Sequence, residues 1–555
     1  PSIFVSKIET QRSSTRHTLP QVLKRPDCES MNGSEEQIIF KAMEDEMARS
    51  KAGLKAKGSS GPLFIDYQLL ESNSIDIVSS LGGIVSSYYN PKSFLVKANV
   101  LIGDSLLVSP STQNLTQLGN KADYYAIRQT LWQTSDAIYK RAISGYSKKL
   151  NMLKNKPKPE TEATKREIFD IAAGEHISES IVNTSIDRKS LEDLCNELSA
   201  VYMDYPELYN TNVHIKVEYT DAYRLNSDGL KLRLPYRNQL IETSACSLVS
   251  NGAEIDEYYT IPFDLQNYNI EDLKNSVREF ADAIMLKSKA DITDDFYIGP
   301  VLLERNTIPY YFSKIVSNYG IARNTWDYES LRYGGTLRSL VGGMLLGKRF
   351  LDTKIGIHIY SDMKSYKGNN LNGTYNLDYD GIRPESDFTF VENGILRNLI
   401  CGRMAASGAS KASGHSQIPL SYSVESKPAA RILHVRVNEA RPYSKVKEQL
   451  FSEARKAGLD YVYTIGSTSN DCFILKRMDI RTGKETPIKE ASMPNITRKE
   501  LMHVVSASKE ENIWLRNSNE TIIAPEAMLL ESVEMNIKKP AKAPQQHLIN
   551  PTLRK

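Results

Sequence analysis

The chain has 555 residues, which is too long for one hydrophobic core, so two domains are the expected number. Charged residues make up 25% and hydrophobic residues 40%, and no apolar run approaches the roughly 18 residues that cross a bilayer, so a disordered or membrane-spanning chain is not indicated. The 70 basic and 67 acidic residues are interspersed and leave a net charge of +3, so the sequence has no basic field that would attract nucleic acid.

A capping box of Ser34 and Gln37 predicts the first helix. Between residues 65 and 108 the sequence predicts an antiparallel meander of short strands, because turn signals such as Asn90-Pro91 interrupt the apolar runs. A long amphipathic helix is expected at residues 123–153, because its apolar residues recur on one stripe.

Alternating apolar residues predict further strands that turn at residues 226–229 and again at Asn251-Gly252. A helix at residues 270–287 follows them. We place the domain boundary at residues 291–295, so that residues 34–290 form an N-terminal α+β domain with an antiparallel sheet and long helices.

Residues 291–555 are expected to form a C-terminal, mostly-β domain with a few helices. A helix is expected at residues 309–319, and strands are expected at residues 298–303, 355–360, 388–391, 395–401, 461–465, 472–478 and 527–535. Antiparallel strands with segregated helices predict an α+β fold rather than a doubly wound sheet.

The compartment is inferred from the cysteines and the N-terminal composition. The five cysteines are odd in number and contain no CxxC pair, so we expect buried thiols in a reducing compartment. Residues 1–33 are polar and without the apolar region of a signal peptide, and we expect a flexible N-terminal segment there. We therefore expect a cytoplasmic protein, or a periplasmic or secreted one if an N-terminal signal was removed.

Several common catalytic motifs are missing or incomplete. The GxxxxGK pattern at residues 342–348 is followed by Arg349 instead of the serine or threonine that holds magnesium, so we interpret it as a glycine-rich linkage. The nucleophile motif G-x-S-x-G does not occur. The sequence places no histidine beside Cys401 or Cys472, and a cysteine nucleophile is therefore not supported.

None of the eight histidines is followed by glutamate, so neither HExxH nor HExxxH occurs. His214 and His358 alternate with apolar strand residues and are expected on solvated faces. His415 lies in a loop of small residues, 407–416, that could wrap an extended peptide or close an active site; a plain surface loop is the alternative. Carboxylates also gather in a hairpin region, where we expect them to be solvated: Asp378, Asp380, Glu385 and Asp387.

Segments along nearly the whole chain, from about residue 35 to 551, resemble the TldD/PmbA family, also called modulators of DNA gyrase, a metallopeptidase-related group. No single segment is diagnostic, but their order and spacing make a chance match improbable. The segments are AMEDEMARS at 42–50, IRQTLWQTSDAIYK at 127–140, NSDG at 226–229, YIGPVLLE at 297–304, GTYNLDYDG at 373–381, VENGILR at 391–397, SGH at 413–415 and IAPEAMLLE at 523–531.

The resemblance implies that catalytic members carry HExxxH on a helix after a segment like residues 299–303, with two histidines on zinc and the glutamate activating water. Here the corresponding residues 304–309 contain no histidine. Arg305 and Pro309 have no lone pair to donate to zinc. The family also contains subunits that lack the motif and pair with a motif-bearing partner to enclose a peptide cleft, and this chain is similar to those.

We therefore expect a protein of peptide processing (proteolysis) that acts as a metal-free, non-catalytic or peptide-binding subunit, with zinc only in motif-bearing relatives. Arg403, Ser413, Gly414 and His415 are the peptide-binding candidates, and we assign no catalytic residue and no metal ligand. Expected partners are a polypeptide and a second subunit, in a homodimer or heterodimer, without nucleic acid or membrane. The alternatives are an active metallopeptidase with atypical ligands such as His415 or Cys472, and a structural or carrier partner protein.

Overall fold

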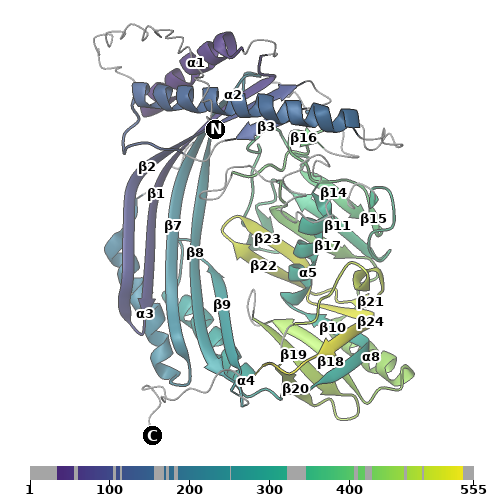
Figure 1. Cartoon of the computed structure of the whole chain (residues 1–555). Helices are drawn as coiled ribbons and strands as arrows, with labels where there is room; N and C mark the ends of the chain where they lie inside the picture. Colours follow the sequence, from purple (N-terminus) through teal and green to yellow (C-terminus); the bar gives the residue numbers. More distant parts are fainter. Residues whose placement is uncertain are drawn as a thin grey trace, which may run out of the picture.

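The computed structural model describes residues 34–55, 61–103, 108–112, 116–155, 168–169, 174–179, 185–250, 252–321, 345–405, 411–418, 428–467, 472–489 and 493–541. Helices and mostly antiparallel strands form an α+β fold, as predicted. In Figure 1 a large curved sheet faces a C-terminal part, residues 295–541, that contains smaller sheets.

The first sheet has eight strands in the order β3-β2-β1-β7-β8-β6, with β4 beside β2 and β9 beside β8. Long strands dominate it, and β1 and β7 stay paired without a break from Asp66↔Asn226 to Ser79↔Val213. The strands are β1 (Phe64–Ser80), β2 (Gly83–Gly103), β3 (Val108–Thr112), β4 (Thr116–Gln117), β6 (His176–Ser178), β7 (Tyr209–Asn226), β8 (Lys231–Leu248) and β9 (Glu254–Pro262).

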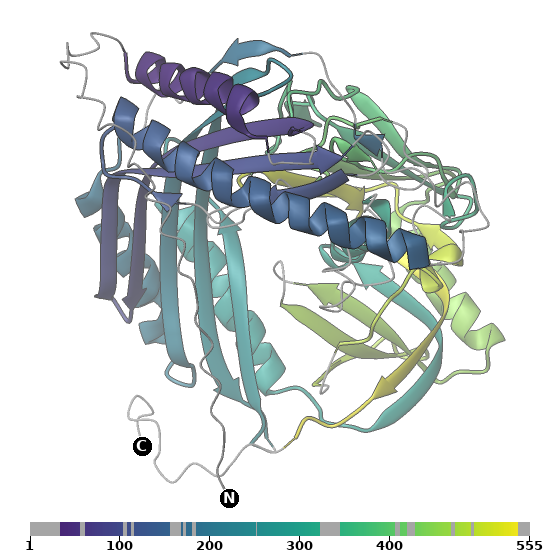
Figure 2. The same ribbon diagram turned by 45° about the horizontal axis from the view of Figure 1, so that its top comes forward.

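Helices cover one face of this sheet. Every second residue of its long strands is apolar, and because alternate side chains point to the same face, these residues form the apolar face on which the helices pack. Helices α1 (Glu35–Gly53) and α2 (Tyr124–Asn155) pack on one end, and Figure 2 shows both lying across the strands. Helices α3 (Arg188–Ala200) and α4 (Ile270–Ser288) pack on the other end, and the short helix Val201–Asp204 follows α3. The capping box of Ser34 and Gln37 is present as predicted.

The opposite face of the sheet carries many polar side chains and is turned towards the C-terminal part. Asp66, Gln68, Ser72 and Ser74 lie on this face of β1, interrupted by Leu70, because successive side chains of a strand alternate between faces. Arg224 lies on the same face of β7, opposite Gln68. Contacts between the sheet and the C-terminal part are made by these polar groups together with an apolar cluster that includes Leu70 and Leu232 of the sheet and Leu377 and Ile418 of the C-terminal part.

The C-terminal part contains two six-stranded sheets, ordered β20-β19-β18-β10-β24-β21 and β15-β14-β11-β17-β23-β22. The pairs β10/β18 and β17/β23 are parallel, and the other pairs within these two sheets are antiparallel. The strands of the first are β10 (Asp295–Glu304), β18 (Tyr461–Ser467), β19 (Phe473–Asp479), β20 (Glu485–Ile488), β21 (Val504–Ala507) and β24 (Ala527–Ile537). Those of the second are β11 (Ile355–Tyr360), β14 (Asp387–Glu392), β15 (Ile395–Leu396), β17 (Ile432–Val437), β22 (Glu511–Asn517) and β23 (Glu520–Pro525).

The main core of the C-terminal part lies between these two sheets, and helix α5 (Thr307–Ile315) is packed into it. A π-helical turn, Val316–Gly320, continues α5. Helix α8 (Tyr443–Lys456) packs on the other face of the first of these sheets, and the turn Glu500–Met502 precedes β21. Two small pairs complete the structure: β12 (Ser365–Tyr366) with β13 (Asn369–Asn370), and β5 (Ile168–Phe169) with β16 (Met404–Ala405).

Two predicted elements were wrong in extent. The predicted meander at residues 65–108 is mainly one long hairpin of β1 and β2, and Asn90-Pro91 lies at a register shift of the pairing near Ser72, not at a turn. The strand predicted at residues 395–401 ends at Leu396. The Arg397 N–H still donates to the Phe390 carbonyl of β14, but the Ile400 N–H donates to the Gly320 carbonyl, so the chain has left the hairpin by that residue.

The remaining predictions concern the N-terminal segment, the glycine-rich pattern, the domain boundary and membrane-spanning helices. Residues 1–33, which the sequence predicted to be flexible, lie outside the described residues, as do residues 342–344 of the glycine-rich pattern; its residues 345–348 are described. The domain boundary at residues 291–295 stays a prediction; it falls between the end of α4 and the first residues of β10. Among the helices that the structure describes, none has an apolar stretch long enough to cross a membrane.

Candidate functional site

A buried ion-pair network joins the first sheet to the C-terminal part, and we call it the Arg224 junction (Asp66, Arg224, Asp378, Asp380 and Ser416). The Nε of Arg224 is 2.7 Å from Oδ1 of Asp66, and its Nη1 is 2.7 Å from Oδ1 of Asp380. The three side chains are at most 7% exposed. Because an unpaired buried charge is costly, these contacts hold Arg224 in one geometry and tie the two parts of the chain together.

Strand register explains why Asp66 and Arg224 meet. Gln68 of β1 lies directly opposite Arg224 of β7, and Asp66 is its diagonal neighbour on the same face. Tyr379 adds to the contact from the C-terminal part, since its ring lies 4.9 Å from the guanidinium carbon and its carbonyl accepts a hydrogen bond from Nη1.

Asp378 organises the turn that carries Asp380. Its Oδ1 accepts hydrogen bonds from the backbone N–H groups of Asp380 and Ile382, at 2.9 and 2.8 Å. Its Oδ2 accepts from the N–H of Ser416 at 2.9 Å, and the Ser416 hydroxyl donates to Oδ2 of Asp380 at 2.5 Å. The expectation that Asp378 and Asp380 are solvated was therefore wrong, because backbone donors and Arg224 satisfy both carboxylates inside the protein.

The two carboxyl groups have pKa values shifted in opposite directions. Burial and the neighbouring charge of Asp380 raise the pKa of Asp378. Burial also raises the pKa of Asp380, but the charge of Arg224 and the hydrogen bond from Ser416 outweigh burial and lower it overall. The pair therefore favours a state in which Asp380 carries the charge.

Of the four peptide-binding candidates, Arg403 contacts the junction directly. Its backbone N–H donates to Asp380 Oδ2 at 3.4 Å, and its side chain forms an ion pair with Asp228 in the β7–β8 turn. The guanidinium carbon lies 4.6 Å from the centre of the Phe64 ring. Arg403 thus bridges the same two parts of the chain as Arg224.

The other three candidates lie on the segment that ends next to the junction. Ser413 accepts a hydrogen bond from the Cys401 N–H and donates one to the Cys401 carbonyl, each at 2.9 Å. Gly414 has φ of 73°, and a Cβ there would lie 2.6 Å from Cα of Pro384, so the position requires glycine. His415 follows and is completely buried.

His415 is a neutral histidine in this environment. Its burial lowers its pKa to about 4. Its Nδ1 is 3.0 Å from the Ser413 hydroxyl, and the arrangement in which that hydroxyl donates to the Cys401 carbonyl places the proton on Nδ1, which then donates to Ser413. The Nε2 is then an acceptor nitrogen, and it is buried without a hydrogen-bond partner among the described residues.

His415 and Cys472, the two candidate atypical metal ligands, have different surroundings in the structure. His415 contacts Phe388 at 4.8 Å between ring centres, whereas Cys472 packs in the core beneath α3 and α4. Within the described ranges, no three His, Cys, Asp or Glu side chains are grouped so that they could hold a metal ion. His214 and His358 are partly exposed, as expected, and form ion pairs, His214 with Asp76 and His358 with Asp387.

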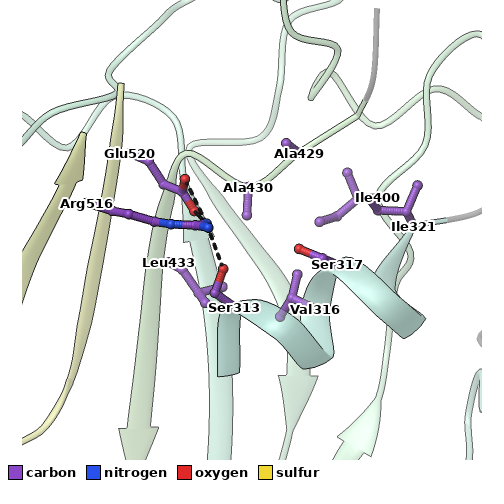
Figure 3. Close-up of a pocket in the computed structure, with 10 residues that line it drawn as sticks. All are labelled: Ser313, Val316, Ser317, Ile321, Ile400, Ala429, Ala430, Leu433, Arg516 and Glu520. Carbon is purple, nitrogen blue, oxygen red and sulfur yellow. Dashed lines mark hydrogen bonds and ion pairs between the residues drawn. The ribbon is translucent and has the colours of Figure 1, made fainter. Parts of the chain in front are cut away.

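A cavity of about 130 Å³ lies beside the C-terminal end of helix α5, the helix that begins within residues 304–309, where the resemblance to the TldD/PmbA family implies a zinc motif. Figure 3 shows Arg516 reaching towards Ser313 and Glu520; its Nη1 is 3.2 Å from the serine hydroxyl and 3.1 Å from Oε1 of Glu520. Burial raises the pKa of Glu520. None of the ten lining residues is a histidine or cysteine, and the one carboxylate is held by arginine, so these side chains do not fit a zinc site.

No protein-family model matches the sequence, and no curated protein matches it by sequence. Solved structures do match. TldE from Thermococcus kodakarensis superimposes with a TM-score of 0.54 over 89% of this chain and 99% of its own, at 13% identity. The chain has the TldE fold.

Two further structures share the TldE fold with this chain, both described as proposed modulators of DNA gyrase. The protein from Thermotoga maritima has a TM-score of 0.55 at 12% identity, covering 89% of this chain and 99% of its own. The protein from Bacteroides thetaiotaomicron has a TM-score of 0.52 at 11% identity, covering 90% and 98%. The resemblance drawn from the sequence is confirmed at the level of the fold.

Sequence reasoning missed Asp66 and Arg224, which complete the junction of this TldE-like fold. Both residues lie on the polar face of strands whose side chains alternate between faces. The alternation predicts the face on which each side chain lies, but it does not predict which residue it contacts. The signal that was present is a charged residue beside apolar neighbours in each strand, Asp66 after Phe64 and Ile65, and Arg224 between Tyr223 and Leu225.

Proposed function

We propose that this chain is a metal-free, peptide-binding subunit of the TldD/PmbA type that acts in peptide processing. The observation that carries the proposal is the chemistry of α5: a helix follows β10 in a TldE-like fold, and its sequence, TIPYYFSKI, offers no imidazole. The cavity beside α5 is lined by apolar and hydroxyl side chains with one arginine–glutamate pair, which suits contact with a polypeptide better than metal chemistry.

The proposal includes a partner and a compartment. A subunit without zinc ligands contributes to hydrolysis only beside a motif-bearing relative, so we expect a heterodimer, with a homodimer as the peptide-binding alternative. The four cysteines that the structure describes are buried thiols rather than disulfides, which favours a reducing compartment such as the cytoplasm.

Native mass spectrometry and peptide binding test the proposal together. We expect a complex with a second subunit, and we expect a fluorescent extended peptide to bind with an affinity that falls in His415→Ala. His358→Ala is the matched control, since His358 is a partly exposed histidine on β11. An inert monomer that ignores peptides would overturn the proposal and favour a structural or carrier protein.

One observation favours a second candidate, an active metallopeptidase with atypical ligands. The buried Nε2 of neutral His415 is an acceptor without a partner among the described residues, and neutral imidazole nitrogen is a metal ligand. This candidate requires that His415→Ala remove both bound zinc and hydrolysis of peptides. The first proposal requires that the variant change peptide affinity without any change in metal content.

A further inference from the structure

A second pocket lies on the polar face of the first sheet, beyond the Arg224 junction along the strands. Its volume is about 80 Å³, and it is formed where β1, β2, β7 and β8 run side by side (Figure 1), with Ile418 of the C-terminal part completing its wall. Hydroxyl groups and one carboxylate share its wall about equally with apolar groups; the wall includes Ser72, Ser74, Glu218, Thr220, Tyr236 and Ile418.

Glu218 is the one ionisable carboxylate in this wall. It faces Ser74 across the β1–β7 pairing. Asn238 and Thr220 provide hydrogen bonds to its side chain, but Oε2 is buried and has no hydrogen-bond partner among the residues that the structure describes. Burial raises the pKa of this carboxyl, as expected for a charge that lacks a close counter-ion.

The pocket suits a small cationic head group with several N–H donors. Ser72 and Thr220 already share a hydrogen bond of 2.8 Å, and their remaining lone pairs can accept more. A primary ammonium has three donors, which match Oε2 of Glu218 and neighbouring hydroxyl oxygens. A divalent metal ion would have only one anionic ligand here.

Size points to the same class of ligand. The volume of about 80 Å³ exceeds the roughly 10–15 Å³ that one water needs, and it leaves room for a head group with a short aliphatic stem. Leu70 and Ile418 supply the apolar part of the wall for such a stem. Segment 411–418 carries both Ile418 and His415, so the pocket and the peptide-binding candidates share one element.

We propose that this pocket binds a protonated primary amine, provided by the amino terminus or a lysine side chain of the bound polypeptide. The amine chemistry stands on the pocket alone, and the polypeptide source rests on the proposed function. Lys216, on the same face of β7, is a cation whose charge acts to lower the pKa of Glu218, so it would compete with a bound amine for the carboxylate.

The test uses n-butylammonium chloride as the probe and the full-length chain, with binding followed by ligand-observed NMR. Glu218→Gln is expected to weaken binding at least about tenfold, because it removes a charge-assisted contact. Glu242→Gln, a carboxylate on the same face that pairs with His214, is the matched control and should bind like wild type. Lys216→Met should bind more tightly.

Tetramethylammonium, a cation without N–H donors, should bind weakly or not at all. Failure of wild type to bind n-butylammonium, equal binding by Glu218→Gln, or equal binding of tetramethylammonium would each overturn the amine site.

Two comparisons identify which amine of the polypeptide enters the pocket. One compares the affinity of a peptide with a free and with an acetylated amino terminus, and the other compares a peptide that contains lysine with one that contains norleucine in its place. The modification that lowers affinity in wild type, but not in Glu218→Gln, names the amine that enters the pocket. If neither modification matters, the polypeptide source is wrong. If no peptide binds while n-butylammonium still does, the proposed peptide function fails and the amine site stands.

Discussion

Arg224 of β7 and Asp380 of the C-terminal part form a buried ion pair with 2.7 Å between Nη1 and Oδ1. Their positions in the sequence are 156 residues apart. Arg224 also pairs with Asp66, so one guanidinium connects strands β1 and β7 to Asp380. Asp380 in turn accepts a hydrogen bond from Ser416, the residue after His415.

Removing the charge of Asp380 should destabilise the protein strongly. Asp380→Asn leaves Asp66 as the one carboxylate of the junction paired with Arg224, and loss of one partner of a buried ion pair costs about 3–5 kcal/mol in the free energy of unfolding. Urea denaturation measures the loss. Asp136→Asn is the control: Asp136 and Lys140 form an exposed pair, and its removal should change the free energy by less than about 1 kcal/mol. Equal effects of the two substitutions would contradict the role of the junction.

His415 should make stability depend on pH between about 6.5 and 4. Its folded-state pKa, about 4, lies below the ordinary 6.5, so the unfolded chain binds the proton first as pH falls. The stabilisation is complete above pH 6.5, is worth about 3 kcal/mol there, and is lost as the pH falls to 4.

The slope is measured by urea denaturation across this range in wild type, in His415→Leu and in the exposed-histidine control His503→Leu. Only His415→Leu should flatten it. An NMR titration of His415 provides a second readout, and protonation near pH 6.5 in the folded protein would refute the assignment of a neutral buried ring.

Gly414 should tolerate alanine far less well than Gly458. Both glycines have left-handed backbone angles, φ of 73° and 67°, so both variants carry backbone strain of about 1–2 kcal/mol. Only at Gly414 does the added Cβ meet backbone, at 2.6 Å from Pro384 Cα, whereas nothing lies within 4 Å at Gly458. Gly414→Ala should therefore lose a further 1–3 kcal/mol or so in thermal unfolding, and similar losses would show that Gly414 is not tightly enclosed.

DNA should not bind this chain in a salt-dependent manner. The 70 basic and 67 acidic residues nearly balance, so few counterions would be released from phosphate. Fluorescence anisotropy with labelled duplex DNA at low and physiological salt checks this. Binding that weakens steeply with salt would reveal a basic surface that the composition hides.

Local signals predicted the helices well. The capping box at Ser34 and the apolar stripe of α2 are set by neighbours within a few residues, and both elements begin within one residue of the prediction. Local signals failed at Asn90-Pro91. These residues are typical of a turn, but in the structure β2 continues through them and stays paired with β1 around a shift in register.

The candidate site was predicted only in part. The small-residue loop indicated Ser413 and His415, but the burial of Asp378 and Asp380 depends on Arg224, a residue that strand register brings from the other part of the chain. Glu218 was missed for the same reason, since its pocket is assembled from four strands and a distant segment.

Zinc content is the most direct test of the central claim, that α5 and its surroundings form a metal-free peptide-binding subunit. Elemental mass spectrometry of the purified full-length chain should find far less than one zinc per chain, with peptide affinity unchanged after treatment with a chelator. Stoichiometric zinc, removed by the chelator together with peptide binding or hydrolysis, would contradict the account.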